Sequence, residues 1–251
     1  MLSLVNADLK IISDITIKTS YHNLSNTFLY LFKRVNKVVE TIKPDLILVQ
    51  GDTISVLVGA LSGKLNEIKV GHIEAGVRSN SLKDPYPEEI IRVMVDVLSD
   101  LHFVPSKVEK ENLDKMGYNF PKVIETGNTV IDALKCINRE ELMPIKTNDI
   151  LVTLHRRESF AKDLKEMCIA IKQVATENTE NRFVVFLHKN LIARRIIKQE
   201  LENVVNIILS ESKGYKETIK TIFSCRAILT DSGGITEEAT YLCKPILIMR
   251  R

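Results

Sequence analysis

Residues 43–76 read KPDLILVQGDTISVLVGALSGKLNEIKVGHIEAG and indicate the fold class of this chain. Two short apolar runs, 46–49 and 70–73, flank a segment of helical period at 54–65. Runs rich in Ile, Leu and Val without polar alternation are typical of strands buried on both faces of a parallel sheet. The segment therefore predicts two parallel strands joined by a covering helix.

The same alternation continues along the 251 residues of the chain. Further apolar runs predict strands at 101–104, 150–154, 183–187, 205–209, 228–230 and 246–249. Amphipathic segments between them predict helices near 28–42, 88–98, 107–116, 130–138, 162–175, 191–201, 216–223 and 235–242. The pattern is typical of a doubly wound α/β architecture. A polar stretch at 139–149 interrupts it, so we expect two Rossmann-like domains, residues 1–140 and 141–251.

The composition of the chain is that of a globular protein and suggests no nucleic-acid or membrane partner. Hydrophobic residues make up 45% and charged residues 27% of the chain, which is the profile of a globular protein. The net charge of +3 gives no argument for nucleic acid or a membrane surface as a partner. Four cysteines occur without a C-x-x-C pair, and no apolar run approaches the ~20 residues of a membrane span. We expect a cytoplasmic protein with buried, reduced thiols.

Carboxylates follow the predicted strands of the first half. Asp52 and Glu74 come directly after two apolar runs, and Glu88 opens a predicted helix. In open parallel sheets, ligands bind beyond the carboxyl ends of the strands. Carboxylates that converge there raise each other's pKa and can serve as acids or bases near neutrality. Taken singly, each is equally explained as a turn or helix-capping acid, as Asp52 would be before residue 54.

The run Asp231-Ser232-Gly233-Gly234 after the strand at 228–230 is the clearest signal for a phosphate. Ser232, Gly233 and Gly234 would let the backbone approach an anion at the start of a helix, where free N–H groups point outward. Glu238, one turn further, could accept hydrogen bonds from ribose hydroxyls. The alternatives are a tight turn with a helix cap, and an acid that complements the helix dipole.

Cationic residues follow two other strands of the second half. His155 and Arg156, with Arg157 beside them, could neutralise a diphosphate, for which Arg is well suited. His188 follows the strand at 183–187 and carries a weaker signal. A solvated run of charges and a structural histidine are the competing interpretations. The chain has no G-x-G-x-x-G and no G-x-x-x-x-G-K-[ST] motif, so we expect no nicotinamide cofactor and no NTPase activity. His72 and Glu74 lie close in the sequence, but the sequence suggests no third ligand, so we expect no required metal.

Taken together, these motifs resemble the non-hydrolysing UDP-N-acetylglucosamine 2-epimerases. In the first half the resemblance rests on Lys43-Pro44-Asp45-Leu46, Gly51-Asp52-Thr53, His72-Ile73-Glu74-Ala75-Gly76, Pro87-Glu88-Glu89 with Arg92, and Thr126-Gly127-Asn128-Thr129-Val130-Ile131-Asp132. In the second half it rests on His155-Arg156-Arg157-Glu158 and Asp231-Ser232-Gly233-Gly234-Ile235 through Glu237-Glu238. The matches span most of the chain from Lys43 onward.

The resemblance implies two Rossmann-like halves of glycosyltransferase type B, with the active site in the cleft between them. It implies loss of the C2 proton and of UDP to give a 2-acetamidoglucal, followed by re-addition of UDP and protonation from the other face. Residue by residue, it implies acid–base roles for Asp52, Glu74 and Glu88, and a catalytic or substrate-binding role for His155. It assigns substrate contacts to Arg92, Arg156, His188, Ser232, Gly233, Gly234 and Glu238. It also implies a UDP-sugar substrate, a homodimer and a role in supplying surface polysaccharide.

The chain departs from the family pattern at both ends. The opening strand with a G-T-R-P-E-type loop is not found, and the sequence stops at Arg251 directly after a strand-like run. We therefore expect each domain to be incomplete. The family's H-x-N-P is His188-Lys189-Asn190-Leu191 here. Three other interpretations remain open: a hydrolysing relative, a glycosyltransferase of the same fold, and a remnant that binds a sugar nucleotide without turnover.

Overall fold

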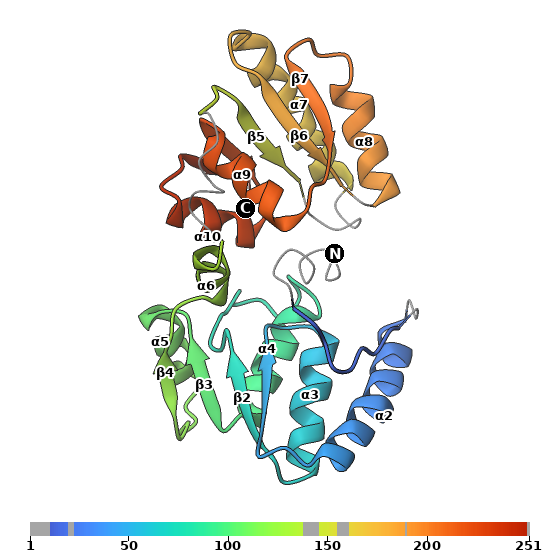
Figure 1. Ribbon diagram of the computed structural model, residues 1–251, viewed down its shortest axis with the longest axis vertical. Coiled ribbons are helices and arrows are strands. Elements are labelled where there is room, and N and C mark those ends of the chain that lie inside the picture. Colours follow the sequence, from blue (N-terminus) through green and yellow to red (C-terminus); the bar gives the residue numbers. More distant parts are fainter. Residues whose placement is uncertain (1–10, 20–22, 138–145, 155–160, 189, 250–251) are drawn as a thin grey trace. The chain divides into compact units, whose positions relative to one another are not determined.

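The computed structural model describes residues 11–19, 23–137, 146–154, 161–188 and 190–249. They form two compact units, one spanning Ser13–Asn128 and the other beginning at Thr129, with residues 11 and 12 assigned to the second. Each unit consists of a parallel sheet with helices packed against it (Figure 1). Each is described by itself below.

The sheet of the first unit has the strand order β1-β2-β3-β4, with all neighbours parallel. The strands are β1 (Leu46–Gln50), β2 (Lys69–Ile73), β3 (Leu101–Val104) and β4 (Val123–Glu125), and the helices are α2 (Leu24–Ile42), α3 (Ile54–Leu65), α4 (Glu88–Leu98) and α5 (Lys107–Lys115). β4 is absent from the sequence prediction, because it is three residues long and only half-buried, and so shows no apolar run. All the carboxyl ends of these strands lie along one edge of the sheet.

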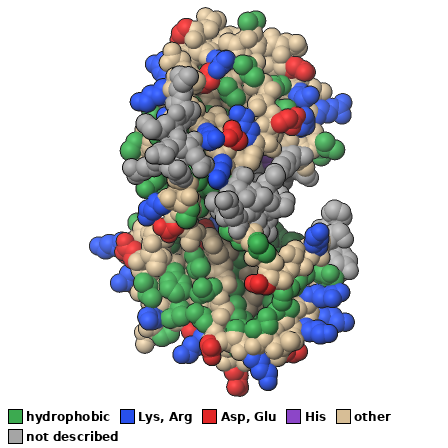
Figure 2. All heavy atoms as spheres, in the orientation of Figure 1, with side chains coloured by type: hydrophobic (Ala, Val, Ile, Leu, Met, Phe, Trp, Pro, Cys, Tyr) green, Lys and Arg blue, Asp and Glu red, His purple; other side chains and the backbone are tan. Residues whose placement is uncertain are grey.

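The core of the first unit lies between its sheet and helices α3 and α4. Val49 and Val70 point from the strands into a cluster that includes Ala60 on α3 and Val95 on α4. Leu46 and Leu48 of β1 are 38% and 55% exposed. Figure 2 shows hydrophobic side chains gathered on the face of this unit that is in view. Helices therefore bury one face of β1 more completely than the other.

The sheet of the second unit has the strand order β7-β6-β5-β8-β9, again with all neighbours parallel. Its elements are α6 (Thr129–Lys135), β5 (Ile150–Thr153), α7 (Ala161–Glu177), β6 (Phe183–Leu187), α8 (Leu191–Leu201), β7 (Ile207–Glu211), α9 (Tyr215–Ser224), β8 (Ala227–Thr230), α10 (Gly233–Tyr241) and β9 (Ile246–Ile248). From β5 the chain builds outward through β6 and β7, and then returns to β8 on the other side. The adjoining ends of β5 and β8 are thus the switch point at which ligands bind in this class of sheet.

Several boundaries differ from those that the sequence predicts, and two of the differences have a clear structural cause. The compact units divide at Asn128/Thr129 rather than at 140/141, because Leu134 of α6 and the neighbouring Ile137 pack into the core of the second unit. β7 begins at Ile207 rather than at 205, since the Asn206 amide donates to the carbonyl oxygens of Ala175, Asn178 and Asn181. These side-chain bonds fix Asn206 in the turn before the strand.

The thiols do not all follow the prediction. Cys168 and Cys225 are buried, whereas Cys136 and Cys243 are exposed, and none of the four forms a disulfide. Burial raises the pKa of the Cys168 thiol to about 12 and that of Cys225 to about 11. Among the described residues, no helix combines the length and the apolar character needed to cross a membrane.

Candidate functional site

In the first unit, two carboxylates follow neighbouring strands. Gly51 after β1 has φ +82°, and its N–H donates to the Ile73 carbonyl at 3.1 Å. The N–H groups of Glu74 and Ala75 after β2 both donate to the Phe103 carbonyl, at 3.1 and 3.2 Å. Because β1 pairs with β2 in parallel, these bonds hold Asp52 and Glu74 at the same edge of the sheet.

Glu74 has two unusual properties. Its φ is +70°, a left-handed conformation that is uncommon for residues other than glycine. Backbone strain of this kind tends to cluster at functional sites. Burial raises the pKa of its carboxyl group, and the charge of Asp52 raises it further, while Arg92 and His72 lower it. A strained backbone together with a raised carboxyl pKa at a strand end marks a candidate acid or base.

Arg92 on α4 joins the carboxylates of this edge. Its Nη2 lies 2.5 Å from Asp52 Oδ2, and its Nη1 donates to Glu89 Oε2 at 3.3 Å. Asp52 is therefore an ion-pair partner, and Thr53, rather than Asp52, occupies the cap of α3. Glu88 is the first residue of α4, one turn before Arg92 on the same helix. The structure thus brings Asp52, Glu74 and Arg92 together and places Glu88 at the start of the helix that carries Arg92.

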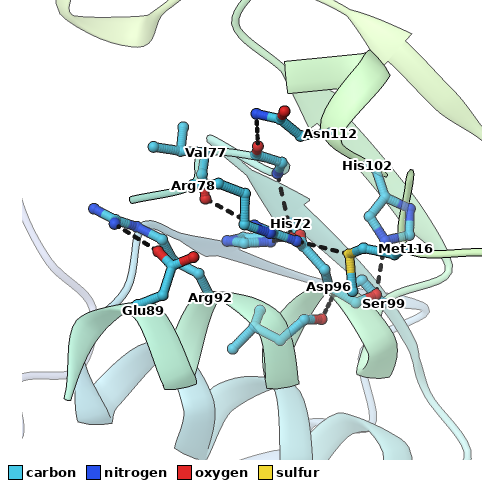
Figure 3. A network of polar contacts seen from close by, with 12 residues as sticks. His72, Val77, Arg78, Glu89, Arg92, Asp96, Ser99, His102, Asn112 and Met116 are labelled. Atoms are coloured by element: carbon cyan, nitrogen blue, oxygen red, sulfur yellow. Dashed lines mark hydrogen bonds and ion pairs between the residues drawn. The ribbon is translucent and has the colours of Figure 1, made fainter. Parts of the chain in front are cut away.

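A buried polar network around His72 and Asp96, to which the sequence assigns no role, is joined to this edge through Gly51 (Figure 3). His72 Nδ1 lies 2.6 Å from Asp96 Oδ1, and His72 Nε2 lies 2.9 Å from the Gly51 carbonyl oxygen. Asp96 Oδ2 accepts from Arg78 Nη2 at 2.5 Å and from the Gly76 N–H at 3.3 Å. The available signal was a single acid, Asp96, within the apolar stretch 93–98, but the sequence does not reveal that its side chain is fully buried.

In the second unit, β5 and β8 are joined by their side chains at the switch point. The hydroxyl oxygens of Thr153 and Thr230 lie 2.6 Å apart, and both residues are fully buried. The Ser232 N–H donates to Thr230 Oγ1 at 3.0 Å. Thr230 therefore anchors the first turn of the Asp231–Gly234 loop to the sheet.

The loop leads into α10 at the position that the sequence predicts. Ser232 is the cap residue, but within the described chain its hydroxyl makes no capping bond to α10. Gly233 and Gly234 are exposed, and a Cβ added at Gly234 would meet no atom within 4 Å. The helix therefore begins with accessible backbone next to the switch point, a suitable position for an anion such as phosphate.

Glu238, one turn into α10, is 6% exposed. Burial raises the pKa of its carboxyl group to about 7, with Glu237 contributing in the same direction, while the Tyr215 hydroxyl lowers it. Burial and the nearby Glu238 in turn raise the pKa of Tyr215. A carboxyl group with this pKa is partly protonated at neutral pH. Glu238 lies on the helix that follows the glycine-rich loop.

Of the three remaining predicted site residues, only His188 belongs to the described part of the chain. His188 follows β6, and its Nδ1 accepts from the Asn190 N–H at 2.9 Å. His155 and Arg156 lie outside the described residues. Within the described part of the chain, no three His, Cys, Asp or Glu side chains are grouped as metal ligands.

Comparison with known proteins shows similarity to one family along the whole chain. The sequence profile of the family described as UDP-N-acetylglucosamine 2-epimerase matches residues 1–251. The UDP-N-acetylglucosamine 2-epimerase of Campylobacter jejuni is 37% identical over 97% of this chain and 68% of its own length. The chain spans about two thirds of the length of this and other curated relatives.

Two solved structures of similar sequence have the same fold as this chain. A Neisseria meningitidis UDP-GlcNAc 2-epimerase bound to UDP-GlcNAc has a TM-score of 0.92 and 35% identity, over 99% of this chain and 71% of that one. The S. aureus MnaA–UDP structure has a TM-score of 0.91 and 33% identity, over 99% and 68%. The expected α/β class, with parallel sheets like those of glycosyltransferase type B-like enzymes, is confirmed.

Proposed function

The chain belongs to the UDP-N-acetylglucosamine 2-epimerase family, and from this premise we propose that it epimerises UDP-N-acetylglucosamine at C2 to UDP-N-acetylmannosamine. The observation that carries the proposal is Glu74, a residue with a strained backbone and a half-buried carboxyl group of raised pKa beside Asp52 and Arg92. A relative of the same fold was solved with UDP-GlcNAc bound, which supports a UDP-sugar as the ligand.

The proposed reaction has two stages. In the first, a carboxylate takes the proton from C2, the C–H electrons form the C1–C2 double bond, and the C1–O bond breaks with its electrons leaving on UDP. The product of this stage is 2-acetamidoglucal and UDP. In the second, UDP adds back to C1 while a carboxylic acid delivers a proton to the opposite face of C2. The reaction is balanced without an oxidant or a reductant.

The first unit would supply the acid and the base from Asp52, Glu74 and Glu88. An acid–base group works best when its pKa lies near the operating pH, and burial moves the pKa of Glu74 in that direction. Arg92 would contact the substrate from its position beside Asp52, where it also neutralises part of the carboxylate charge. Removal of a C2 proton requires such a group within hydrogen-bond reach of the sugar.

The second unit would hold UDP. The backbone of Ser232, Gly233 and Gly234 would contact the diphosphate at the start of α10, and Glu238 would accept hydrogen bonds from the ribose. His155, Arg156 and His188 would neutralise the charge that develops on the departing UDP. Assembly as a homodimer and a role in surface polysaccharide supply stay predictions from the resemblance, and a cytoplasmic location stays a prediction from the composition.

The alternative is a binding protein that holds the sugar nucleotide without turnover. The glycine-rich loop at the start of α10 fits this function as well, because it would hold UDP whether or not the carboxylates of the first unit act on the sugar. The two functions differ in one observable, the exchange of the C2 proton with solvent.

The test is incubation with UDP-N-acetylglucosamine in deuterium oxide, followed by proton NMR. We expect deuterium at C2 and the appearance of UDP-N-acetylmannosamine. A parallel thermal melt with millimolar UDP should show stabilisation, because a ligand that binds only the native state raises its stability. Stabilisation by UDP without deuterium at C2 would support the binding protein. No stabilisation at all would overturn the assignment of the glycine-rich loop.

A further inference from the structure

The two ring nitrogens of His72 both face hydrogen-bond acceptors. Nε2 lies 2.9 Å from the Gly51 carbonyl oxygen, which can only accept, so Nε2 carries a proton. Nδ1 lies 2.6 Å from Asp96 Oδ1. The ring is fully buried, so water takes no part in these bonds. The proton on Nδ1 therefore depends on the ionisation of Asp96.

Asp96 is a carboxylate. Burial raises its pKa, but hydrogen bonds and charges from His72 and Arg78 outweigh burial and hold the pKa below its usual range. Its Oδ2 already accepts from Arg78 Nη2 and from the Gly76 N–H. An ionised carboxylate only accepts hydrogen bonds, so His72 Nδ1 is the donor of the remaining contact. Both ring nitrogens of His72 then carry protons.

His102 on the neighbouring strand provides an internal comparison. It pairs with His72 in the sheet register and is also fully buried, but its Nε2 lies 2.8 Å from the backbone carbonyl of Asp96 rather than from the carboxylate. Its Nδ1 has no hydrogen-bond partner among the described residues. One proton on Nε2 satisfies His102, so a neutral ring is sufficient there.

We propose that His72 is a doubly protonated positioning residue that ties the Asp52 turn and the Glu74 turn to one buried carboxylate, Asp96. Through Nε2 it holds Gly51, the residue before Asp52. Through Asp96, which accepts from the Gly76 N–H, it is joined to the turn that begins at Glu74. Figure 3 shows His72 and Arg78 beside Asp96 at the centre of this network. The inference rests on the proposed acid–base function of the two carboxylates.

The charge of His72 has a second consequence. His72, Arg78 and Asp96 together comprise two cations and one anion, and the positive charge of His72 lowers the pKa of Glu74. It thereby opposes burial and Asp52, which raise that pKa, and acts in the same direction as Arg92. His72 thus keeps Glu74 able to ionise while it fixes the spacing of the turns.

The first test needs neither turnover nor a variant. Nitrogen-15 NMR of the histidine side chains distinguishes an imidazolium, whose two nitrogens resonate close together, from a neutral ring, whose nitrogens are widely separated. At neutral pH we expect His72 to give the imidazolium pattern and His102 the neutral one. A neutral pattern for His72 would overturn the proposal.

Two substitutions separate the charge from the bond to Gly51. The amide of Gln reaches the position of Nε2 and can still donate to Gly51, whereas the shorter amide of Asn reaches only the position of Nδ1. His72→Gln and His72→Asn both remove the charge, so the pKa of Glu74, followed by carbon-13 NMR, should rise in both. His102→Gln is the matched control, with the same burial and the same chemical change, and should leave the Glu74 titration unchanged. An unchanged Glu74 pKa in both His72 variants would contradict the charge assignment.

Kinetics test the positioning role. Loss of the Gly51 bond in His72→Asn should lower kcat about tenfold, with His72→Gln retaining more of it, while UDP affinity stays unchanged in both. Equal kcat values in the two variants would overturn the role of the Gly51 bond. If the wild-type chain exchanges no C2 proton, the proposed epimerisation fails, and the two NMR measurements still decide the state of His72 and its influence on Glu74.

Discussion

Nη2 of Arg92 on α4 lies 2.5 Å from Oδ2 of Asp52, which follows β1. Arg92 also lowers the pKa of Glu74, the carboxyl group at the end of the neighbouring strand. One cation therefore acts on two carboxylates that the chain separates by more than twenty residues.

Arg92→Met removes that cation and should raise the pKa of Glu74. A base with a higher pKa stays protonated to higher pH, so the acidic limb of C2-proton exchange should move to higher pH, with a loss of about tenfold or more at neutrality. Carbon-13 NMR of Glu74 and the pH dependence of deuterium incorporation measure the two effects. Arg182→Met, which breaks an exposed ion pair with Asp149, is the control and should change neither.

Glu74→Gln should lower C2-proton exchange by about a hundredfold or more, because an amide cannot accept or return the proton. UDP should still stabilise the variant against heat as it does the wild type. Glu67→Gln is a matched control, since Glu67 is an exposed residue of the same unit with a similar φ of +57°. Turnover retained by Glu74→Gln would remove Glu74 from the catalytic set.

Gly76→Ala should destabilise the first unit by about 3 kcal/mol. Gly76 has φ +76°, and an added Cβ would overlap the Glu109 carbonyl oxygen, so positive-φ strain and overpacking add together. Gly117→Ala at φ +72° meets no atom within 4 Å and should cost only about 1 kcal/mol. Urea unfolding of the two variants compares them, and equal losses would mean that the contact with Glu109 has no effect.

Thr230→Val should weaken UDP binding about tenfold, because the Ser232 N–H loses its acceptor and β8 loses its side-chain bond to Thr153. Thr240→Val, on the exposed part of α10, removes a hydroxyl that bonds only within the helix and should leave the affinity unchanged. Calorimetric titration with UDP measures both. An unaltered affinity in Thr230→Val would show that the loop keeps its shape without this anchor.

Glu238 should make the stability of the second unit depend on pH. Its folded pKa of about 7 lies above the ordinary value of 4.5, so the folded state binds more protons than the unfolded state between these values. The stabilisation is complete below about pH 4.5 and is lost as pH rises through 7, by up to about 3 kcal/mol. Urea unfolding at pH 5 and pH 8 should therefore differ more in the wild type than in Glu238→Gln. The same difference in both proteins would contradict the assignment.

Much of the fold could be predicted from local sequence. The runs at 46–49, 101–104 and 183–187 coincide with strands to within a residue, because buried parallel strands are apolar throughout. β4 escaped prediction because a half-buried strand of three residues has no such pattern. The start of β7 depended on three carbonyl groups that hold Asn206, which no local pattern encodes.

Chain order alone determined which residues follow each strand, and therefore that Asp52, Glu74 and Ser232 stand at the carboxyl ends of strands in parallel sheets. Only the tertiary structure decided how these residues behave. Ionisation depends on burial and on charged or hydrogen-bonding groups of other elements. Arg92 and Asp96 belong to α4, and Tyr215 belongs to α9. The sequence specifies that a residue is Asp or Glu, but the pKa of its carboxyl group depends on whether folding buries it and on which charged groups folding places beside it.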